Sequence, residues 1–218
     1  MAEVRIFVRP YASSLPLGFF AFGIGMLLLG GDANGWLQPS ERHTVGLLLA
    51  AFVFPLELVC AIFAFLARDT FGATGLGIFT PTWLALGLAN LIASQDARSH
   101  AIGLFEFGFA FAVVLLAVAA MAGKPLIGAI MLVAAARSAL AGVHEWGGPS
   151  WAWTTAGWLG VAIFATAMYG GLAFLLEDVG KKEVLPVFRR GASKESLEGD
   201  LASQLSQLGD EAGVRQTL

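Results

Sequence analysis

The chain has 218 residues and a net charge of −3, and its composition is 57% hydrophobic and only 13% charged. Soluble domains average roughly 45–50% apolar and about 25% charged residues, so this chain has too few polar side chains to cover a water-facing surface. The composition therefore predicts an integral membrane protein whose solvent is the lipid bilayer, and it gives no indication of a nucleic-acid partner.

Six apolar segments approach the length of about 20 helical residues that is needed to cross the hydrocarbon of a bilayer. In chain order they are expected at residues 15–31, 44–67, 74–93, 101–122, 126–143 and 151–176. Short connections rich in Gly, Pro and charge separate them, which predicts one all-α bundle of six transmembrane helices. The predicted organisation is a cytosolic N-terminal segment (1–14), the six-helix domain (15–188) and a cytosolic C-terminal tail (189–218).

The tail changes in composition after about Ser193. Leucines recur there at helical spacing, at positions 197, 201, 205 and 208. This spacing is compatible with a short amphipathic helix, but short isolated helices are only marginally stable, so disorder remains an equal alternative.

Basic residues near the helix ends predict the orientation of the bundle. The side that both termini share carries eight of them: Arg5, Arg9, Arg68, Lys124, Lys181, Lys182, Arg189 and Arg190. The opposite side carries only Arg42 and Arg98. This asymmetry predicts a multi-pass protein of the plasma membrane with both termini in the cytoplasm.

Two opposite charges fall at matching depths inside neighbouring spans. With a rise of about 1.5 Å per residue, Glu106 lies roughly 8 Å and Arg137 roughly 9 Å below the outer side. A very short turn joins their helices, so the helices must be antiparallel neighbours. We therefore expect Glu106 and Arg137 to form an ion pair, with an Arg137 that faces an anion as the alternative.

A third buried charge, Glu57, is predicted roughly 20 Å below the outer side, where no basic residue matches its depth. Pro55 removes a backbone donor and frees a carbonyl, so a protonated Glu57 that donates to this carbonyl is one interpretation. The alternative is a carboxyl group that lines a pore or takes up a proton.

Residue types with other chemistry are scarce. His43, His100 and His144 are expected in solvated loops on the outer side. The spacing of His, Cys, Asp and Glu suggests no metal site, and no Ser–His–Asp arrangement is legible. The sequence therefore predicts neither an enzyme nor a bound cofactor.

Three segments, in matching order, resemble the acetate uptake transporter family of the SatP/YaaH type. They are Leu15-Pro16-Leu17-Gly18 with Phe22-Gly23, then Asp69-Thr70-Phe71-Gly72 followed by Phe79 and Trp83, and finally Ala156-Gly157-Trp158-Leu159-Gly160 with the closing Leu185-Pro186. The resemblance spans about residues 10–188. It implies a homo-hexamer in which each six-helix protomer has its own pore.

The resemblance also implies candidate site residues. A hydrophobic constriction in the family corresponds here to Phe22, Phe79 and a fifth-helix position between Ala134 and Arg137, for which Ala134 is taken. The family's tyrosine is replaced by Phe79 and a polar glutamine by Glu57, whereas Glu106 and Arg137 have no recognised counterpart. As charged groups inside the spans, Glu57, Glu106 and Arg137 are expected to line the pore or take up protons. Because the family pattern lacks them, the chain resembles a divergent member of this family.

The leading functional interpretation is a transporter or channel for small monocarboxylates such as acetate, with succinate also conceivable, in which protonation favours passage. A urea- or amide-type channel for small neutral solutes is the first alternative, because such channels also combine aromatic pores with intramembrane carboxylates. A membrane scaffold or sensor that acts through the C-terminal tail is the second alternative. The expected partners are the lipid bilayer, the small solute and other copies of the chain.

Overall fold

The computed structural model of the protein describes residues 11–92, 98–180, 182–191, 193–194 and 197. The leucine-spaced tail, whose predicted helix depends on Leu201, Leu205 and Leu208, lies outside the described residues, as does most of the predicted N-terminal segment.

Six helices of the described chain are long and apolar enough to cross a membrane, which confirms the predicted all-α architecture. Five of them are α1 (Leu15–Ala33), α4 (Thr70–Ile92), α5 (His100–Gly123), α6 (Pro125–Glu145) and α7 (Ser150–Gly180). The remaining span, Pro39–Leu66, consists of a short 3-10 turn, α2 (Arg42–Leu48), the π-helical turn η2 (Leu49–Val53) and α3 (Phe54–Leu66). The predicted spans match these helices, and the largest differences lie at the ends of α4, α7 and the second span.

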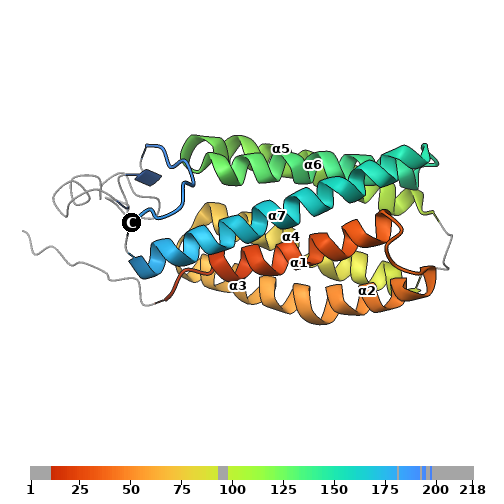
Figure 1. The fold of residues 1–218 in the computed structure, drawn as a ribbon, viewed down its shortest axis with the longest axis horizontal. Helices are drawn as coiled ribbons and strands as arrows, with labels where there is room; N and C mark the ends of the chain where they lie inside the picture. Colours follow the sequence, from red (N-terminus) through yellow and green to blue (C-terminus); the bar gives the residue numbers. More distant parts are fainter. Residues whose placement is uncertain (1–10, 93–97, 181, 192, 195–196, 198–218) are drawn as a thin grey trace, which may run out of the picture.

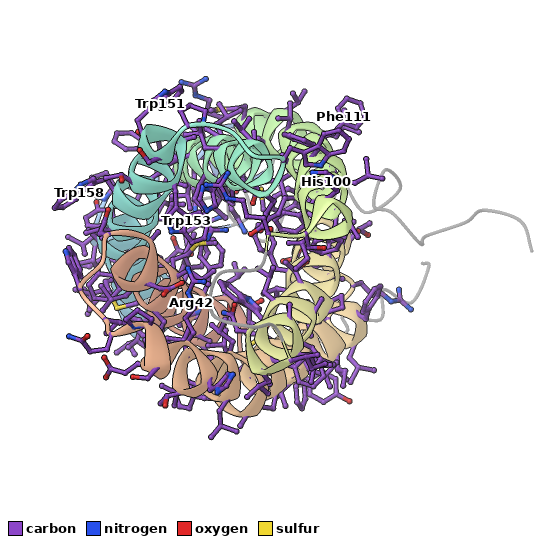
Figure 2. All side chains as sticks on the ribbon, turned by 90° about the vertical axis from the view of Figure 1, so that its right-hand side faces the viewer. Arg42, His100, Phe111, Trp151, Trp153 and Trp158 are labelled. Carbon is purple, nitrogen blue, oxygen red and sulfur yellow. The ribbon has the colours of Figure 1, made fainter. Side chains whose placement is uncertain are left out.

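The helices form a ring when the bundle is viewed from one end (Figure 2). Around it α1 packs against α7, α7 against α6, α6 against α5, and α5 more loosely against α4. The second span closes the ring, because its halves pack against both α4 and α1. The beginning of α1 and the end of α7 lie at the same end of the bundle (Figure 1). We call this the terminal end, and the end with the α1–α2 and α6–α7 connections the far end.

Glycines allow α1 and α7 to pack with their backbones almost in contact. A Cβ atom added at Gly30 would lie 2.9 Å from the carbonyl oxygen of Gly157, and one added at Gly160 would lie 3.0 Å from that of Met26. Small residues permit such close approach, and in lipid this packing replaces the hydrophobic effect as the force that holds helices together.

The second span changes its helical geometry just before Pro55. Proline has no backbone N–H and its ring collides with the carbonyl four residues earlier, here that of Ala51. The wider turn η2 (Leu49–Val53) immediately precedes it and lets the helix continue into α3. Turns of this type occur frequently at functional sites. Glu57 follows this turn closely, two residues beyond the proline.

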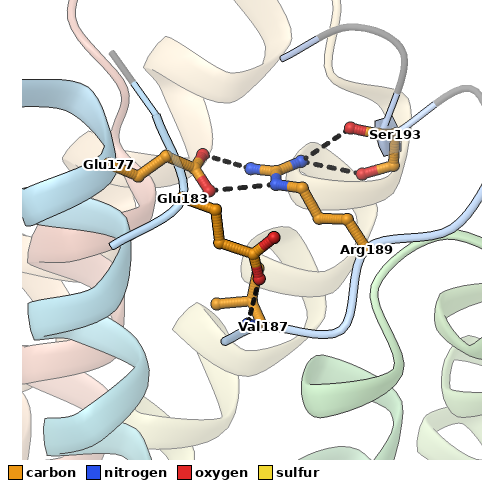
Figure 3. A network of polar contacts seen from close by, with 5 residues as sticks. All are labelled: Glu177, Glu183, Val187, Arg189 and Ser193. Atoms are coloured by element: carbon orange, nitrogen blue, oxygen red, sulfur yellow. Dashed lines mark hydrogen bonds and ion pairs between the residues drawn. The ribbon is translucent and has the colours of Figure 1, made fainter. Parts of the chain in front are cut away.

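After α7 the chain folds back across the terminal end as a strap without regular secondary structure, residues 184–190 (Figure 3). The Arg189 guanidinium forms an ion pair with Glu177 of α7 and donates to the Ser193 hydroxyl over 2.7 Å. The Val187 side chain is fully buried, and the Arg190 N–H donates to the carbonyl of Gly123 over 2.9 Å. The strap thus fastens the end of α7 to the turn between α5 and α6.

Candidate functional site

A cavity opens into the terminal end of the ring between α1, α3, α4 and α6. It offers about 70 Å³ in which the centre of a water molecule could lie. Its lining is apolar apart from Glu57: Leu15, Gly18, Phe19, Phe22, Phe71, Gly72, Gly75, Leu76, Phe79, Ile127, Ile130 and Met131. Because Leu15, Phe71 and Ile127 come from the first turns of their helices, the cavity begins at the terminal end and runs inward.

Phe22 and Phe79 meet at the inner end of this cavity. Their ring centroids lie 5.0 Å apart with the planes at 82°, and both side chains are buried. Trp83, one turn further along α4, stands edge-to-face against Phe22 at 5.9 Å. The structure therefore brings together the two phenylalanines that the sequence analysis named. Edge-to-face pairs of this kind stabilise the arrangement by about 0.5–1.5 kcal/mol beyond the burial of their area.

Phe109 of α5 completes the aromatic cluster, and the sequence analysis missed it. Its ring lies 5.0 Å from that of Phe79, with the planes at 88°. The signal was present in the spacing: Phe109 follows Glu106 by three residues and therefore lies on the same face of the helix. Phe22, Phe79, Trp83 and Phe109 are called the aromatic gate below.

Ala134, the third predicted constriction residue, is fully buried on α6. It lies one turn beyond the cavity-lining Ile130 and Met131 and one turn before Arg137, on the same face of the helix.

Glu57 is completely buried, and neither of its carboxyl oxygens has a hydrogen-bond partner among the described residues. The interpretation that Glu57 bonds a carbonyl freed by Pro55 is therefore wrong. The group that interacts with the carboxyl is instead the indole of Trp83, whose N–H also lacks a hydrogen-bond partner in the described part of the chain. A buried polar group without a partner is costly, so Glu57 is a candidate site residue.

Glu106 and Arg137 form the predicted ion pair, which confirms the antiparallel packing of α5 and α6. Arg137 Nη1 lies 3.6 Å from Glu106 Oε1, and the two side chains are only 3% and 4% exposed. Among described residues, Arg137 Nε and Glu106 Oε2 have no hydrogen-bond partner. Ser138 is the other polar side chain that interacts with the Glu106 carboxyl. The closest approach of the two groups is thus a long ionic contact rather than a pair of parallel hydrogen bonds.

The three histidines expected in loops belong to helices instead: His43 to the start of α2, His100 to the start of α5 and His144 to the last turn of α6. His43 and His100 are exposed, whereas His144 at the far end is half-buried. The His144 ring stacks on Trp153 of α7 with the centroids 4.7 Å apart. Arg42 and Trp153 point toward the middle of the ring, whereas Trp151, Trp158 and Phe111 point outward (Figure 2). Arg42 forms an ion pair with Asp32 over 3.1 Å, and both Arg42 and Arg98 act electrostatically on His144.

The apolar cavity and the aromatic cluster offer a hydrated ion few polar groups in exchange for its water. The charged groups buried near them are the carboxyls of Glu57 and Glu106 and the guanidinium of Arg137. No group of three His, Cys, Asp or Glu side chains within the described residues could hold a metal ion.

Comparisons with known proteins bear on the fold. No family model matches the sequence, and neither does any curated protein. The fold, however, is similar to the solved structure of the bacterial acetate channel SatP, with a TM-score of 0.73 at 18% sequence identity. The match covers 81% of this chain and 99% of that chain. The chain therefore shares the six-helix membrane fold of an acetate channel.

Proposed function

We propose that the protein is a membrane channel or transporter for small monocarboxylates, with acetate as the reference solute. The observation that supports this proposal is an apolar cavity that ends on the pair Phe22–Phe79, within a fold shared with the acetate channel SatP. Short carboxylates combine a charged end with a small apolar end, so an apolar passage with few fixed charges suits them.

The solute crosses the gate more readily as the neutral acid. An isolated charge is far more costly to remove from water than a neutral polar group, and the gate offers an anion only ring edges and an indole N–H in return. Uptake should therefore be faster at low pH, where more of the solute is protonated.

The proposed path runs through the middle of the ring. From the far end it passes His144 and Trp153, then Arg137 and Glu106, then the aromatic gate and Ala134. It enters the cavity beside Glu57 and leaves at the terminal end. Glu57, Glu106 and Arg137 are the groups that we expect to line the path or to exchange protons.

The distribution of basic residues supports an orientation with both termini in the cytoplasm of a cell whose plasma membrane holds the protein. Arg68, Lys124 and Arg189 lie at the terminal end, whereas Arg42 and Arg98 lie at the far end. Positive residues are retained on the cytoplasmic side of membranes. We extend the proposal to a homo-hexamer in which each protomer carries its own path.

Uptake of labelled acetate into proteoliposomes tests the proposal, with protein-free liposomes as the measure of passive diffusion of acetic acid. Two neighbouring residues of α6 provide a matched pair of variants. Met131→Trp places a large ring in the cavity, whereas Leu132→Trp adds the same ring on an exposed face of the helix. We expect the wild type and Leu132→Trp to transport and Met131→Trp to be blocked.

Equal uptake with and without protein at every pH would overturn the carboxylate proposal. Urea flux without acetate flux would instead favour the neutral-solute channel. Absence of both fluxes would favour a scaffold or sensor.

A further inference from the structure

The ion pair Glu106–Arg137 is built unlike a structural salt bridge. A guanidinium group ordinarily binds a carboxylate through two parallel hydrogen bonds. Here the closest charged atoms lie 3.6 Å apart, and Arg137 Nε and Glu106 Oε2 are left without a hydrogen-bond partner among described residues although both side chains are almost fully buried. The Glu106 carboxylate therefore leaves part of the hydrogen-bonding capacity of the Arg137 guanidinium unused.

We propose that Arg137 is a binding site for the carboxylate of the transported solute, and that the side chain of Glu106 occupies this site when the solute is absent. This inference rests on the proposed function, because it specifies where along the path the monocarboxylate is recognised.

The chemistry of the glutamate side chain supports the idea that acetate can replace the Glu106 carboxylate at Arg137. Its terminal CH₂–COO⁻ group differs from acetate by a single hydrogen atom. Space that accommodates the head of Glu106 against Arg137 therefore accommodates acetate once Glu106 has turned away. A free acetate is not tethered to α5, so it can adopt the two-pronged geometry that Glu106 does not reach.

The ion pair lies next to the gate residue Phe109 on α5 and next to Ala134 on α6. On α5, Glu106 precedes the gate residue Phe109 by three positions, and on α6 Arg137 follows Ala134 by three positions. Residues three apart lie on one face of a helix, so the pair lies directly next to the gate. His144, two turns beyond Arg137 on α6, continues this face toward the far end.

Displacement of Glu106 has a consequence for charge. An unpaired carboxylate buried in the bundle is unfavourable, so the released Glu106 takes up a proton. The charged groups that act on it from α6 are Arg137 and Glu145, and α4, the other helix packed against α5, contains no ionisable residue. One bound anion and one proton thus enter together, and the net charge of the site is unchanged.

Acetate binding to the full-length protein in lipid nanodiscs tests the site directly. Glu106→Gln removes the internal competitor, and the double variant Glu106→Gln with Arg137→Gln removes the cation as well without leaving a buried charge. Since interactions with charged groups contribute about 1.5–3 kcal/mol, Glu106→Gln should bind acetate about tenfold or more tightly than the wild type. The double variant should lose this gain.

A measurement on the wild type keeps the test decisive if the variants do not fold. Addition of ¹³C-acetate should produce the infrared band of a protonated carboxylic acid in the protein. Glu57→Gln, which removes the other buried carboxyl group of the membrane spans, should retain this band.

The proposal is overturned if Glu106→Gln binds acetate no more tightly than the wild type, if the double variant binds as tightly as the single one, or if the wild type binds acetate without the new band. Acetate uptake combined with any of these results would remove the Arg137 site and leave the proposed function intact. Tight acetate binding to Glu106→Gln without acetate uptake by the wild type would support the Arg137 site and overturn the proposed function.

Discussion

Replacement of Arg137 by leucine should destabilise the bundle strongly, and the structure gives the magnitude. The charged atoms of Arg137 and Glu106 lie 3.6 Å apart, and both side chains are buried. At this distance, and with an effective dielectric constant of about 20, the Coulomb attraction is about 5 kcal/mol. Arg137→Leu removes this attraction and leaves Glu106 buried without a counter-charge, which typically costs about 3–5 kcal/mol.

The double variant with Glu106→Leu and Arg137→Leu should recover most of that loss. Two apolar side chains of similar volume replace a buried ion pair at little cost, and in several proteins such exchanges are neutral or stabilising. We therefore expect a coupling free energy of about 3–5 kcal/mol from the double-mutant cycle. Denaturation of the protein in mixed micelles, followed through the fluorescence of its six tryptophans, measures each unfolding free energy.

The pair Arg42–Asp32 provides the control within the same chain. The Arg42 side chain is 32% exposed, so solvent screens the attraction. Its cycle should give a coupling of about 1 kcal/mol or less. Additive effects of Glu106→Leu and Arg137→Leu, or equal coupling in both cycles, would refute the reasoning that burial makes the inner pair strong.

Three further variants test the gate, the packing and the strap. Phe22→Ala should widen the gate and raise propionate uptake relative to acetate by about tenfold, because one methylene group at a tight site contributes about 1–3 kcal/mol. Gly160→Leu should lower the free energy of unfolding by about 1–3 kcal/mol, since its side chain would collide with the backbone of α1. Arg189→Leu should accelerate hydrogen exchange of the strap amides about tenfold or more, because it removes the ion pair with Glu177 and the bonds to Ser193.

Matched controls separate these effects from general damage. Phe111→Ala removes an outward-facing ring of α5 and should leave solute selectivity unchanged. Gly108→Leu adds a side chain where no atom lies within 4 Å, and leucine is the better helix former, so stability should be unchanged or rise by up to about 1 kcal/mol. Unchanged selectivity in Phe22→Ala, equal stability of the two glycine variants, or unchanged exchange in Arg189→Leu would each contradict the corresponding expectation.

In the sequence, charged residues inside the apolar spans predicted more about the contacts within the bundle than any motif did. The depth argument places Glu106 beside Arg137 because a short turn fixes the register of two neighbouring antiparallel helices. It provides no partner for Glu57, and the structure agrees that its carboxyl has no hydrogen-bond partner in the described chain. The bond from Glu57 to a freed carbonyl was nevertheless wrong: the carboxyl makes no such bond, and the helix widens into the π-helical turn Leu49–Val53 just before Pro55.

By itself the sequence determined that six segments are long and apolar enough to cross a membrane, since the required span length and apolar composition follow directly from the thickness of the bilayer. Only the tertiary structure decided which faces of the helices turn inward. Nearly all positions of a lipid-embedded helix are apolar, so periodicity does not distinguish a lipid-facing ring such as Phe111 from a gate ring such as Phe109. The stack of His144 on Trp153 and the cavity beside Glu57 likewise depend on packing between helices that are distant along the chain.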